Sequence, residues 1–240
     1  MSLQFIMGNS GSGKSYCLYD TVVREAIENP DKNYLVIVPE QFTMQTQKDL
    51  CLAHPKGGIM NIDVLSFGRL AYRVFEEVGQ DARVVLDDEG KNLVLRKIAG
   101  ECEKDLKVFK GNLKKQGYIS EVKSVLSEFA QYGVDFERLD DFMKEVPPES
   151  YLHYKLDDIR TIYEKFEEYL SEKYITKEEM LDVLSDAVPY SDILKGSVVA
   201  MDGFTGFTPV QNRLIGELFF SVRKSDDHSD DGRKRKSVCI

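Results

Sequence analysis

Residues 8–15 read Gly8-Asn9-Ser10-Gly11-Ser12-Gly13-Lys14-Ser15 and fill every fixed position of the phosphate-binding pattern G-x-x-x-x-G-K-[ST]. An apolar run, Leu3 to Met7, precedes this glycine loop, and the residues from Tyr16 to Glu28 are predicted to form a helix. Glycine lets backbone N–H groups turn toward phosphates, and the helix N-terminus adds a favourable dipole. The stretch therefore predicts a strand, loop and helix that bind a nucleoside triphosphate at the start of an α/β domain.

Within the glycine loop, each residue type has an expected task. Lys14 would reach the β- and γ-phosphates of ATP, and the Ser15 hydroxyl would be a ligand of Mg²⁺. The alternative is a glycine-rich turn that matches the pattern by chance. The expected nucleotide contacts are Gly8, Asn9, Ser10, Gly11, Ser12, Gly13, Lys14 and Ser15.

Composition narrows the class of protein more than its partners. The 240 residues are 42% hydrophobic and 30% charged, as in an ordinary globular protein. No apolar run is long enough to cross a membrane, and the chain enters the expected first strand at once, so a cytoplasmic place is expected. The net charge of −9 argues against binding nucleic acid through bulk charge, but leaves room for a local basic groove. Four scattered cysteines indicate reduced thiols rather than a metal or disulfide framework.

Strand-like runs lie toward the two ends of the chain. After Leu3–Met7 they are Tyr34–Val38, Ile59–Ser66 and Ser197–Met201, each apolar or β-branched and bounded by turn residues. Continuous apolar strands that alternate with helical patterns predict a parallel sheet with helices on both faces. A helix is expected for Pro209–Val222.

Between about residues 87 and 187 the apolar periodicity is helical throughout, with a break at Pro147-Pro148. This pattern predicts an all-helical subdomain, residues 87–189, inserted into an α/β domain made of residues 1–86 and 190–240. A core face is the main interpretation of its regular apolar stripes, and a partner groove is the alternative. The stripes are Ile119, Val122, Leu126 and Phe129, and Leu152, Leu156, Ile159, Tyr163, Phe166 and Leu170.

Beyond the last predicted helix, residues 223–236 form a polar run that reads as a solvated loop. Its basic cluster, Arg233–Lys236, leaves a nucleic-acid patch as the alternative. Ser237–Ile240 begins to look like another strand, which suggests the front part of a longer protein.

A carboxylate that could hold the Mg²⁺ shell ends the fourth strand. Asp202 follows Ser197–Met201, at the strand end where α/β sheets bind their ligands. The alternative is a strand-ending Asp-Gly turn. Many ATPases carry a Glu after this Asp that orients the attacking water, but this chain has Gly203. The sequence therefore predicts weak ATP hydrolysis.

Taken together, four segments resemble the AddB family of ATP-dependent helicase–nuclease subunits, which process double-strand DNA ends for recombination. They are the glycine loop, Val38-Pro39-Glu40-Gln41-Phe42-Thr43, Leu65-Ser66-Phe67-Gly68-Arg69-Leu70, and the run Asp202-Gly203-Phe204-Thr205-Gly206-Phe207-Thr208-Pro209-Val210-Gln211. The resemblance covers the whole chain. It implies a RecA-like P-loop domain, Mg-ATP and DNA as ligands, and a heterodimer with an AddA-like motor subunit.

The resemblance also implies site residues. By analogy with superfamily-one helicases, Gln41, Phe42, Phe67 and Arg69 would contact single-stranded DNA, and Gln211 would lie near the nucleotide. The sequence departs from those helicases at Gly203, and nothing before Leu3 matches the motif that reads adenine. The expected function is thus a helicase-like ATP- and DNA-binding module with weak or no hydrolysis alone. Two alternatives stay open: a P-loop small-molecule kinase, and a structural docking domain with a vestigial nucleotide site.

Overall fold

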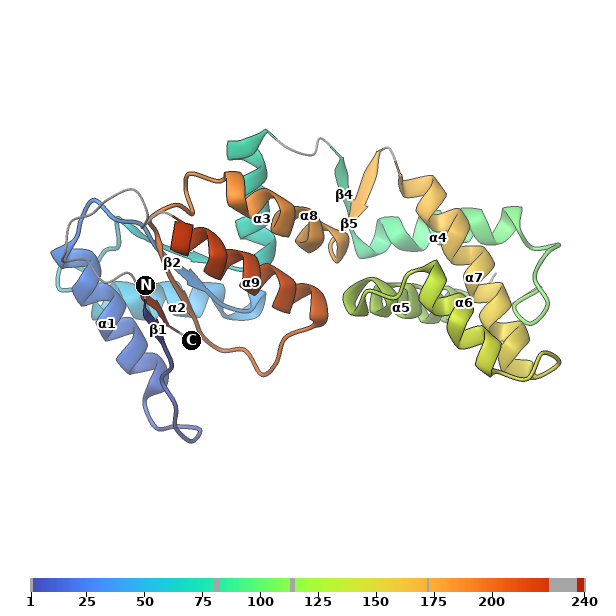
Figure 1. Ribbon diagram of the computed structural model, residues 1–240, viewed down its shortest axis with the longest axis horizontal. Coiled ribbons are helices and arrows are strands. Elements are labelled where there is room, and N and C mark those ends of the chain that lie inside the picture. Colours follow the sequence, from blue (N-terminus) through green and yellow to red (C-terminus); the bar gives the residue numbers. More distant parts are fainter. Residues whose placement is uncertain (1, 80–82, 113–114, 172, 225–236, 240) are drawn as a thin grey trace. The chain divides into compact units, whose positions relative to one another are not determined.

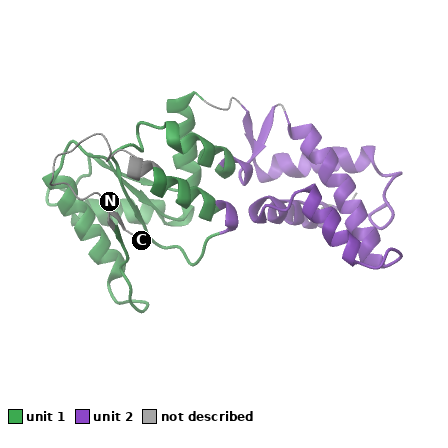
Figure 2. Ribbon diagram, viewed as in Figure 1, with its two compact units in different colours: residues 1–80, 181–207, 211–240 green, residues 81–180, 208–210 purple. Residues whose placement is uncertain are grey.

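A computed structural model of the chain describes residues 2–79, 83–112, 115–171, 173–224 and 237–239. Two compact units account for it (Figure 2): unit 1 comprises residues 1–80, 181–207 and 211–240, and unit 2 residues 81–180 and 208–210. Among the described residues, no helix combines the length and the apolar character needed to cross a membrane.

Unit 1 is built on a parallel sheet of five strands in the order β1-β7-β6-β2-β3 (Figure 1). This confirms the predicted parallel α/β architecture, including the strand expected at the end of the chain. The strand that precedes the glycine loop and the strand that precedes Asp202 are separated by β7 alone. The strands are β1 (Ser2–Gln4), β7 (Ser237–Cys239), β6 (Val198–Met201), β2 (Tyr34–Ile37) and β3 (Ile62–Leu65).

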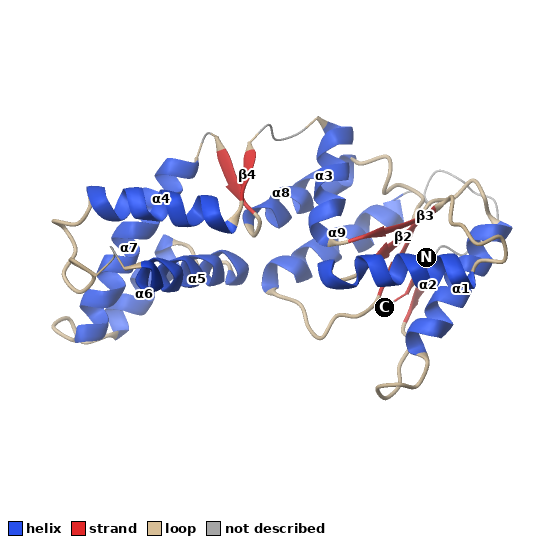
Figure 3. Ribbon diagram, turned by 180° about the vertical axis from the view of Figure 1, so that it is seen from behind, coloured by secondary structure: helices blue, strands red, loops and turns tan. Residues whose placement is uncertain are grey.

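The two inner strands β2 and β6 are buried along their whole length, because helices cover both faces of the sheet. Tyr34 and Val36 pack with apolar residues of α1 (Lys14–Glu28) and of α2 (Thr43–Ala53) on one face. On the other side lie α3 (Phe67–Val78) and α9 (Pro209–Lys224), as Figures 1 and 3 show. Short 3₁₀ turns at Glu40–Phe42 and Val188–Tyr190 and helix α8 (Glu179–Ala187) complete the connections.

Unit 2 consists mainly of helices, but the expectation of an all-helical region is wrong at one point. Strand β5 (Tyr174–Thr176) pairs in parallel with β4 (Val84–Leu86). The aromatic and β-branched residues of β5 favour this extended backbone. Parallel strands need a crossover connection, and the helices of unit 2 supply it. These helices are α4 (Asp88–Glu101), α5 (Gln116–Tyr132), α6 (Phe136–Glu145) and α7 (Tyr151–Leu170).

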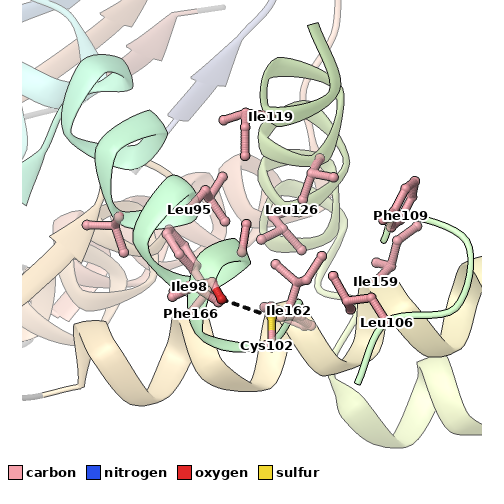
Figure 4. Close-up of a cluster of buried hydrophobic side chains, with 14 of the residues drawn as sticks. Leu95, Ile98, Cys102, Leu106, Phe109, Ile119, Leu126, Ile159, Ile162 and Phe166 are labelled. Carbon is pink, nitrogen blue, oxygen red and sulfur yellow. Dashed lines mark hydrogen bonds between the residues drawn. The ribbon is translucent and has the colours of Figure 1, made fainter. Parts of the chain in front are cut away.

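The predicted apolar stripes form the core of unit 2 (Figure 4). Ile119 and Leu126 of α5 meet Ile159, Ile162 and other residues of α7 in one buried cluster, and the Cys102 thiol in it donates to the Ile98 carbonyl at 2.9 Å. Leu152, at the N-terminal end of the second stripe, differs from the prediction because it is about half exposed. Core packing is therefore the role of these stripes.

Two charged side chains are buried inside unit 2 together with their hydrogen-bond partners. The Asp158 carboxylate accepts hydrogen bonds from the backbone N–H groups of Lys107, Val108 and Phe109 at 2.7–2.8 Å. The Lys91 ammonium donates to Ser127 and is paired with Glu178 at 2.7 Å. Burial of a charge is tolerated when hydrogen bonds replace its water, as they do at both positions.

The polar run at 223–236 falls largely outside the described residues, which end at Lys224 and resume at Ser237. The basic cluster Arg233–Lys236 lies in that gap. The preceding helix, α9, extends two residues beyond its predicted end, from Val222 to Lys224.

Candidate functional site

The glycine loop leads from β1 directly into α1, which begins at Lys14 (Figure 1). Gly11 and Gly13 have φ values of 76° and 83°, in the left-handed region where other residues are strained. A Cβ at Gly8 would lie 2.5 Å from the Ser12 hydroxyl oxygen, so this position also requires glycine. The backbone thus takes a path that only these glycines allow, and it leads into the N–H groups of the first turn of α1.

The Lys14 side chain and Asp202 line one pocket of about 180 Å³. In this structure the Lys14 ammonium donates to the carbonyl oxygens of Gly8 and Asn9, at 3.0 and 2.9 Å, and so folds over its own loop. The remaining lining is mostly apolar, with Ile6 and Leu18 among its residues, and Asp202 is the one carboxylate among the described residues that line it. A positively and a negatively charged side chain therefore share one cavity.

Asp202 lies at the carboxyl end of β6 and is partly buried. Its backbone N–H donates to the Ile37 carbonyl of the adjacent strand at 3.1 Å, which ties the end of β6 to β2. Its Oδ2 accepts a hydrogen bond of 2.8 Å from the Tyr19 hydroxyl of α1, which also contacts Thr46 Oγ1 of α2 at 3.2 Å. Three elements of unit 1 thus fix this carboxylate.

Gly203 has a positive φ of 78°, and a Cβ there would lie 3.3 Å from the ring of Phe42 and 3.4 Å from Pro39. The residue after Asp202 is therefore the contact point for the segment that follows β2. A glutamate at this position would need both a strained backbone and displacement of Phe42. The sequence showed that the side chain is absent, and the structure shows why this backbone excludes one.

The two predicted DNA segments, which follow β2 and β3, are linked to each other through Glu40. The Ser66 hydroxyl donates to one oxygen of the Glu40 carboxylate, and the Arg69 guanidinium lies 3.4 Å from the other. Gln41 is exposed, and so is Phe42, with 45% of its surface accessible. Arg69 is also exposed, and its backbone N–H donates to the Ser66 hydroxyl that caps α3. The structure therefore brings Gln41, Phe42 and Arg69 to the surface of unit 1.

Phe67, the fourth residue predicted to face DNA, is buried, with 6% of its surface accessible. Its ring packs at 5.3 Å against Phe204, which in turn packs at 5.0 Å against Phe207. Phe204 and Phe207 also line the pocket that holds Lys14. In this conformation Phe67 supports that wall, and a base could stack on it only if the ring left Phe204.

Gln211 lies in the first turn of α9, nine positions after Asp202. It is not among the described residues that line the pocket with Lys14 and Asp202. The structure does not bring it to the glycine loop, so its predicted nucleotide role is carried by sequence position alone.

The residues present fit a nucleotide and its cation. The glycine path and the N-terminus of α1 suit phosphate oxygens, Lys14 supplies a mobile positive charge, and Ser15 with Asp202 offers hydroxyl and carboxylate oxygens. Hard cations such as Mg²⁺ are bound through such oxygens together with substrate phosphates. The donor set is therefore appropriate for Mg-ATP.

Tyr19 is the residue of the site that sequence reasoning missed. Its position in α1, five residues after Lys14, reads as one more apolar position of an amphipathic helix. Only the packing of α1 against the sheet shows that its hydroxyl meets a carboxylate 183 residues later.

Comparison with known proteins gives consistent matches. The family model described as "ADDB, N-terminal" matches residues 5–225. A protein of Lachnoclostridium phytofermentans is 46% identical over 98% of this chain and 21% of its own length. Proteins of Alkaliphilus metalliredigens and Clostridium tetani are each 36% identical, over 91% and 93% of this chain and 19% and 20% of their own lengths. All three are named as the second of the subunits of an ATP-dependent helicase/deoxyribonuclease, and this chain spans about one-fifth of their length.

Proposed function

The chain belongs to the AddB N-terminal family, and from that membership we propose that it is the ATP- and DNA-binding, helicase-like module of a helicase–nuclease that processes DNA ends. The observation that carries the proposal is the shared pocket of Lys14 and Asp202 at the head of the glycine loop. We assign unit 1 to the RecA-like P-loop class, because its parallel sheet and glycine loop fit that class.

Each polar residue of the pocket has a role in this proposal. The backbone N–H groups of residues 8–15 bind the phosphates, and Lys14 turns from the Gly8 and Asn9 carbonyls to the β- and γ-phosphates. Ser15 and Asp202 hold Mg²⁺, which supplies charge neutralisation at the phosphates when it is bound. Gln211 is kept as a nucleotide contact on its sequence position.

Hydrolysis in this module is weak in the proposed function. Gly203 supplies no general base, and Asp202 is already engaged by Tyr19 and assigned to the cation. Without a group that orients or deprotonates the attacking water, general-base catalysis, which contributes roughly 10²–10⁴-fold, is lost. The site therefore binds ATP for longer than it turns it over.

Single-stranded DNA would lie across the ends of β2 and β3. Phe42 offers an aromatic face for a base, Gln41 a hydrogen-bonding amide and Arg69 a cation for a phosphate, and all three are exposed. Phe67 holds the start of α3 in place beneath them. The relatives are named as one component of a larger enzyme, which supports an AddA-like motor subunit as the partner of the whole protein.

Nucleotide binding is tested by titrating the chain with a fluorescent ATP analogue in Mg²⁺. Wild type should bind saturably, and Lys14→Ala should weaken binding at least about 10-fold, in the range of a lost charged hydrogen bond. Lys195→Ala, an exposed lysine of unit 1 paired with Asp192, is the matched control. Absence of saturable binding by wild type would favour the structural docking role, and phosphate transfer to a small metabolite would favour the kinase.

DNA binding is tested separately with a labelled oligonucleotide. Phe42→Ala should weaken binding by about 1–3 kcal/mol, the range of one lost base–aromatic stack. Arg69→Ala should also lower the salt dependence of binding by about one charge. Met44→Ala and Arg24→Ala replace exposed residues outside the two segments and should leave affinity unchanged.

A further inference from the structure

The Tyr19 hydroxyl is a polar group at the site that the proposed function does not use. It projects from α1, the helix that begins at Lys14, and reaches both the end of β6 and helix α2. Its ring is partly buried on the side of the sheet where α1 and α2 pack. A phenol that is placed between two helices and a candidate metal ligand calls for an explanation.

The direction of the two hydrogen bonds follows from the chemistry of the groups. Asp202 as a carboxylate can only accept, so the single hydroxyl proton of Tyr19 goes to Asp202 Oδ2, at 2.8 Å. Thr46 Oγ1, at 3.2 Å, must then be the donor to Tyr19. Burial, the largest cause, and the nearby Asp202 together raise the pKa of Tyr19 to about 12, so the phenol keeps this proton at neutral pH.

The hydrogen bond restrains the carboxylate. A bond to Oδ2 fixes the rotation of the Asp202 side chain, and the chain Thr46–Tyr19–Asp202 runs in one direction, so each donor strengthens the next. Oδ2 is committed to Tyr19, which leaves Oδ1 as the oxygen for a cation. Partners that orient a metal-ligating carboxylate in this way govern metal affinity.

We propose that Tyr19 is a positioning residue that orients Asp202 for Mg²⁺ and thereby sets the magnesium dependence of nucleotide binding. The inference rests on the proposed function of the pocket. Tyr19 touches neither nucleotide nor cation in this role, because it acts through Asp202. It assigns α1 two tasks: its N-terminus receives the phosphates, and its second turn aligns the cation ligand.

A purely structural role makes a different prediction. If Tyr19 served only to hold α1 against the sheet, its loss would loosen the glycine loop as well. Nucleotide affinity would then fall equally with and without Mg²⁺. The ratio of the two affinities therefore distinguishes a positioning role from a packing role.

The experiment measures the dissociation constant of a fluorescent ATP analogue for the chain in excess Mg²⁺ and in EDTA. Tyr19→Phe keeps the ring and removes only the hydroxyl. We expect it to reduce the Mg²⁺-dependent gain in affinity by about 10–100-fold, the range found when a partner of a metal ligand is removed. Its affinity in EDTA should stay within about twofold of wild type, with an unchanged circular dichroism spectrum.

Two variants serve as controls. Tyr163→Phe removes another buried phenol whose pKa is also raised to about 12 by burial, but it lies in unit 2 and should not change the ratio. Thr46→Val removes the other partner of Tyr19 and leaves the bond to Asp202, so its effect should be smaller than that of Tyr19→Phe.

Two results overturn the inference while the proposed function stands: wild type shows the Mg²⁺-dependent gain and Tyr19→Phe keeps it, or Tyr19→Phe loses affinity equally in Mg²⁺ and in EDTA. A wild-type chain that binds no nucleotide in either condition refutes the proposed function and this inference with it. The two failures are therefore distinguishable by the wild-type titration alone.

Discussion

Asp158 in unit 2 and Asp202 in unit 1 are the same side chain in opposite situations. Asp158 is almost completely buried and accepts three backbone hydrogen bonds from one loop. Asp202 opens onto a pocket and accepts a side-chain hydrogen bond from Tyr19. The same contrast separates Lys91, which is buried and paired with Glu178, from Lys14, whose partners are carbonyls of an exposed loop.

The difference teaches how a polar residue in this chain can be assigned a role. Where the fold supplies all the partners of a charge, the charge stabilises the fold, and its removal leaves those partners unsatisfied. Where the fold supplies few partners and a cavity lies beside the group, a ligand can supply the rest. Mutations in the two units should therefore move different observables, stability in one and binding in the other.

The largest effect is expected at Asp158. Asp158→Ala leaves three backbone N–H groups near the core without an acceptor, and we expect a loss of about 3–5 kcal/mol in the free energy of unfolding, measured by urea denaturation. Asp157→Ala is the matched control, because its neighbouring carboxylate forms an exposed pair with Lys107 and should contribute less than about 1 kcal/mol. Equal losses in the two variants would erase the contrast.

A smaller effect on stability is expected in unit 1 when a glutamate is placed after Asp202. Gly203→Glu forces a non-glycine residue into a left-handed backbone and against Phe42, at a cost of about 1–2 kcal/mol. Steady-state ATP hydrolysis should not rise, because the new carboxylate must displace Phe42 before it can face the pocket. A large gain in hydrolysis by this variant would show that only the missing base limits the site.

Glu167 of unit 2 gives a smaller, pH-dependent effect. Burial, followed by the nearby Glu179 carboxylate, raises the pKa of Glu167 from an ordinary value of 4.5 to about 7. The folded chain therefore binds more protons than the unfolded chain between these values, and its stability falls as the pH rises from about 4.5 to 7.

The variant Glu167→Gln removes this ionisation and keeps a group that can donate to Glu179. We expect it to be more stable than wild type by about 1 kcal/mol at pH 8, a value limited by solvent screening of a partly exposed group, and near wild type at pH 4. Thermal melts of both proteins across this range measure it. A constant difference between them at all pH values would contradict the assignment.

The smallest effect is expected for an exposed ion pair. Lys144 and Asp141 lie 2.7 Å apart on the surface of α6. Lys144→Ala should change the free energy of unfolding by less than about 0.5 kcal/mol, because water solvates both charges well. A loss as large as that of Asp158→Ala would mean that the number of partners does not separate structural from solvated charges here.

Local sequence patterns were enough to predict the strands of the sheet, the glycine loop and the helical middle of the chain. They failed where long-range packing decides. Strand β5 is too short to interrupt a helical pattern, and it exists because β4 lies beside it. Asp158 reads as a polar position beside an apolar stripe, yet a loop about fifty residues earlier buries it.

The candidate site was predictable in the same uneven way. Lys14 and Asp202 follow from loop pattern and strand end, and the structure brings them to one pocket. The burial of Phe67 and the contact between Gly203 and Phe42 depend on which loops meet at the edge of the sheet. That meeting is set by strand order, which no short motif encodes.

The pairing of β4 with β5 has a consequence for how this chain can change in length. It closes a loop of about 90 residues with a register of three pairs. Loop-closure entropy grows only with the logarithm of length, so doubling such a loop costs about 0.6 kcal/mol. Insertions in the turns between the helices of unit 2 are therefore nearly neutral to closure, whereas a single proline in β4 or β5 would remove ladder hydrogen bonds that hold the loop shut.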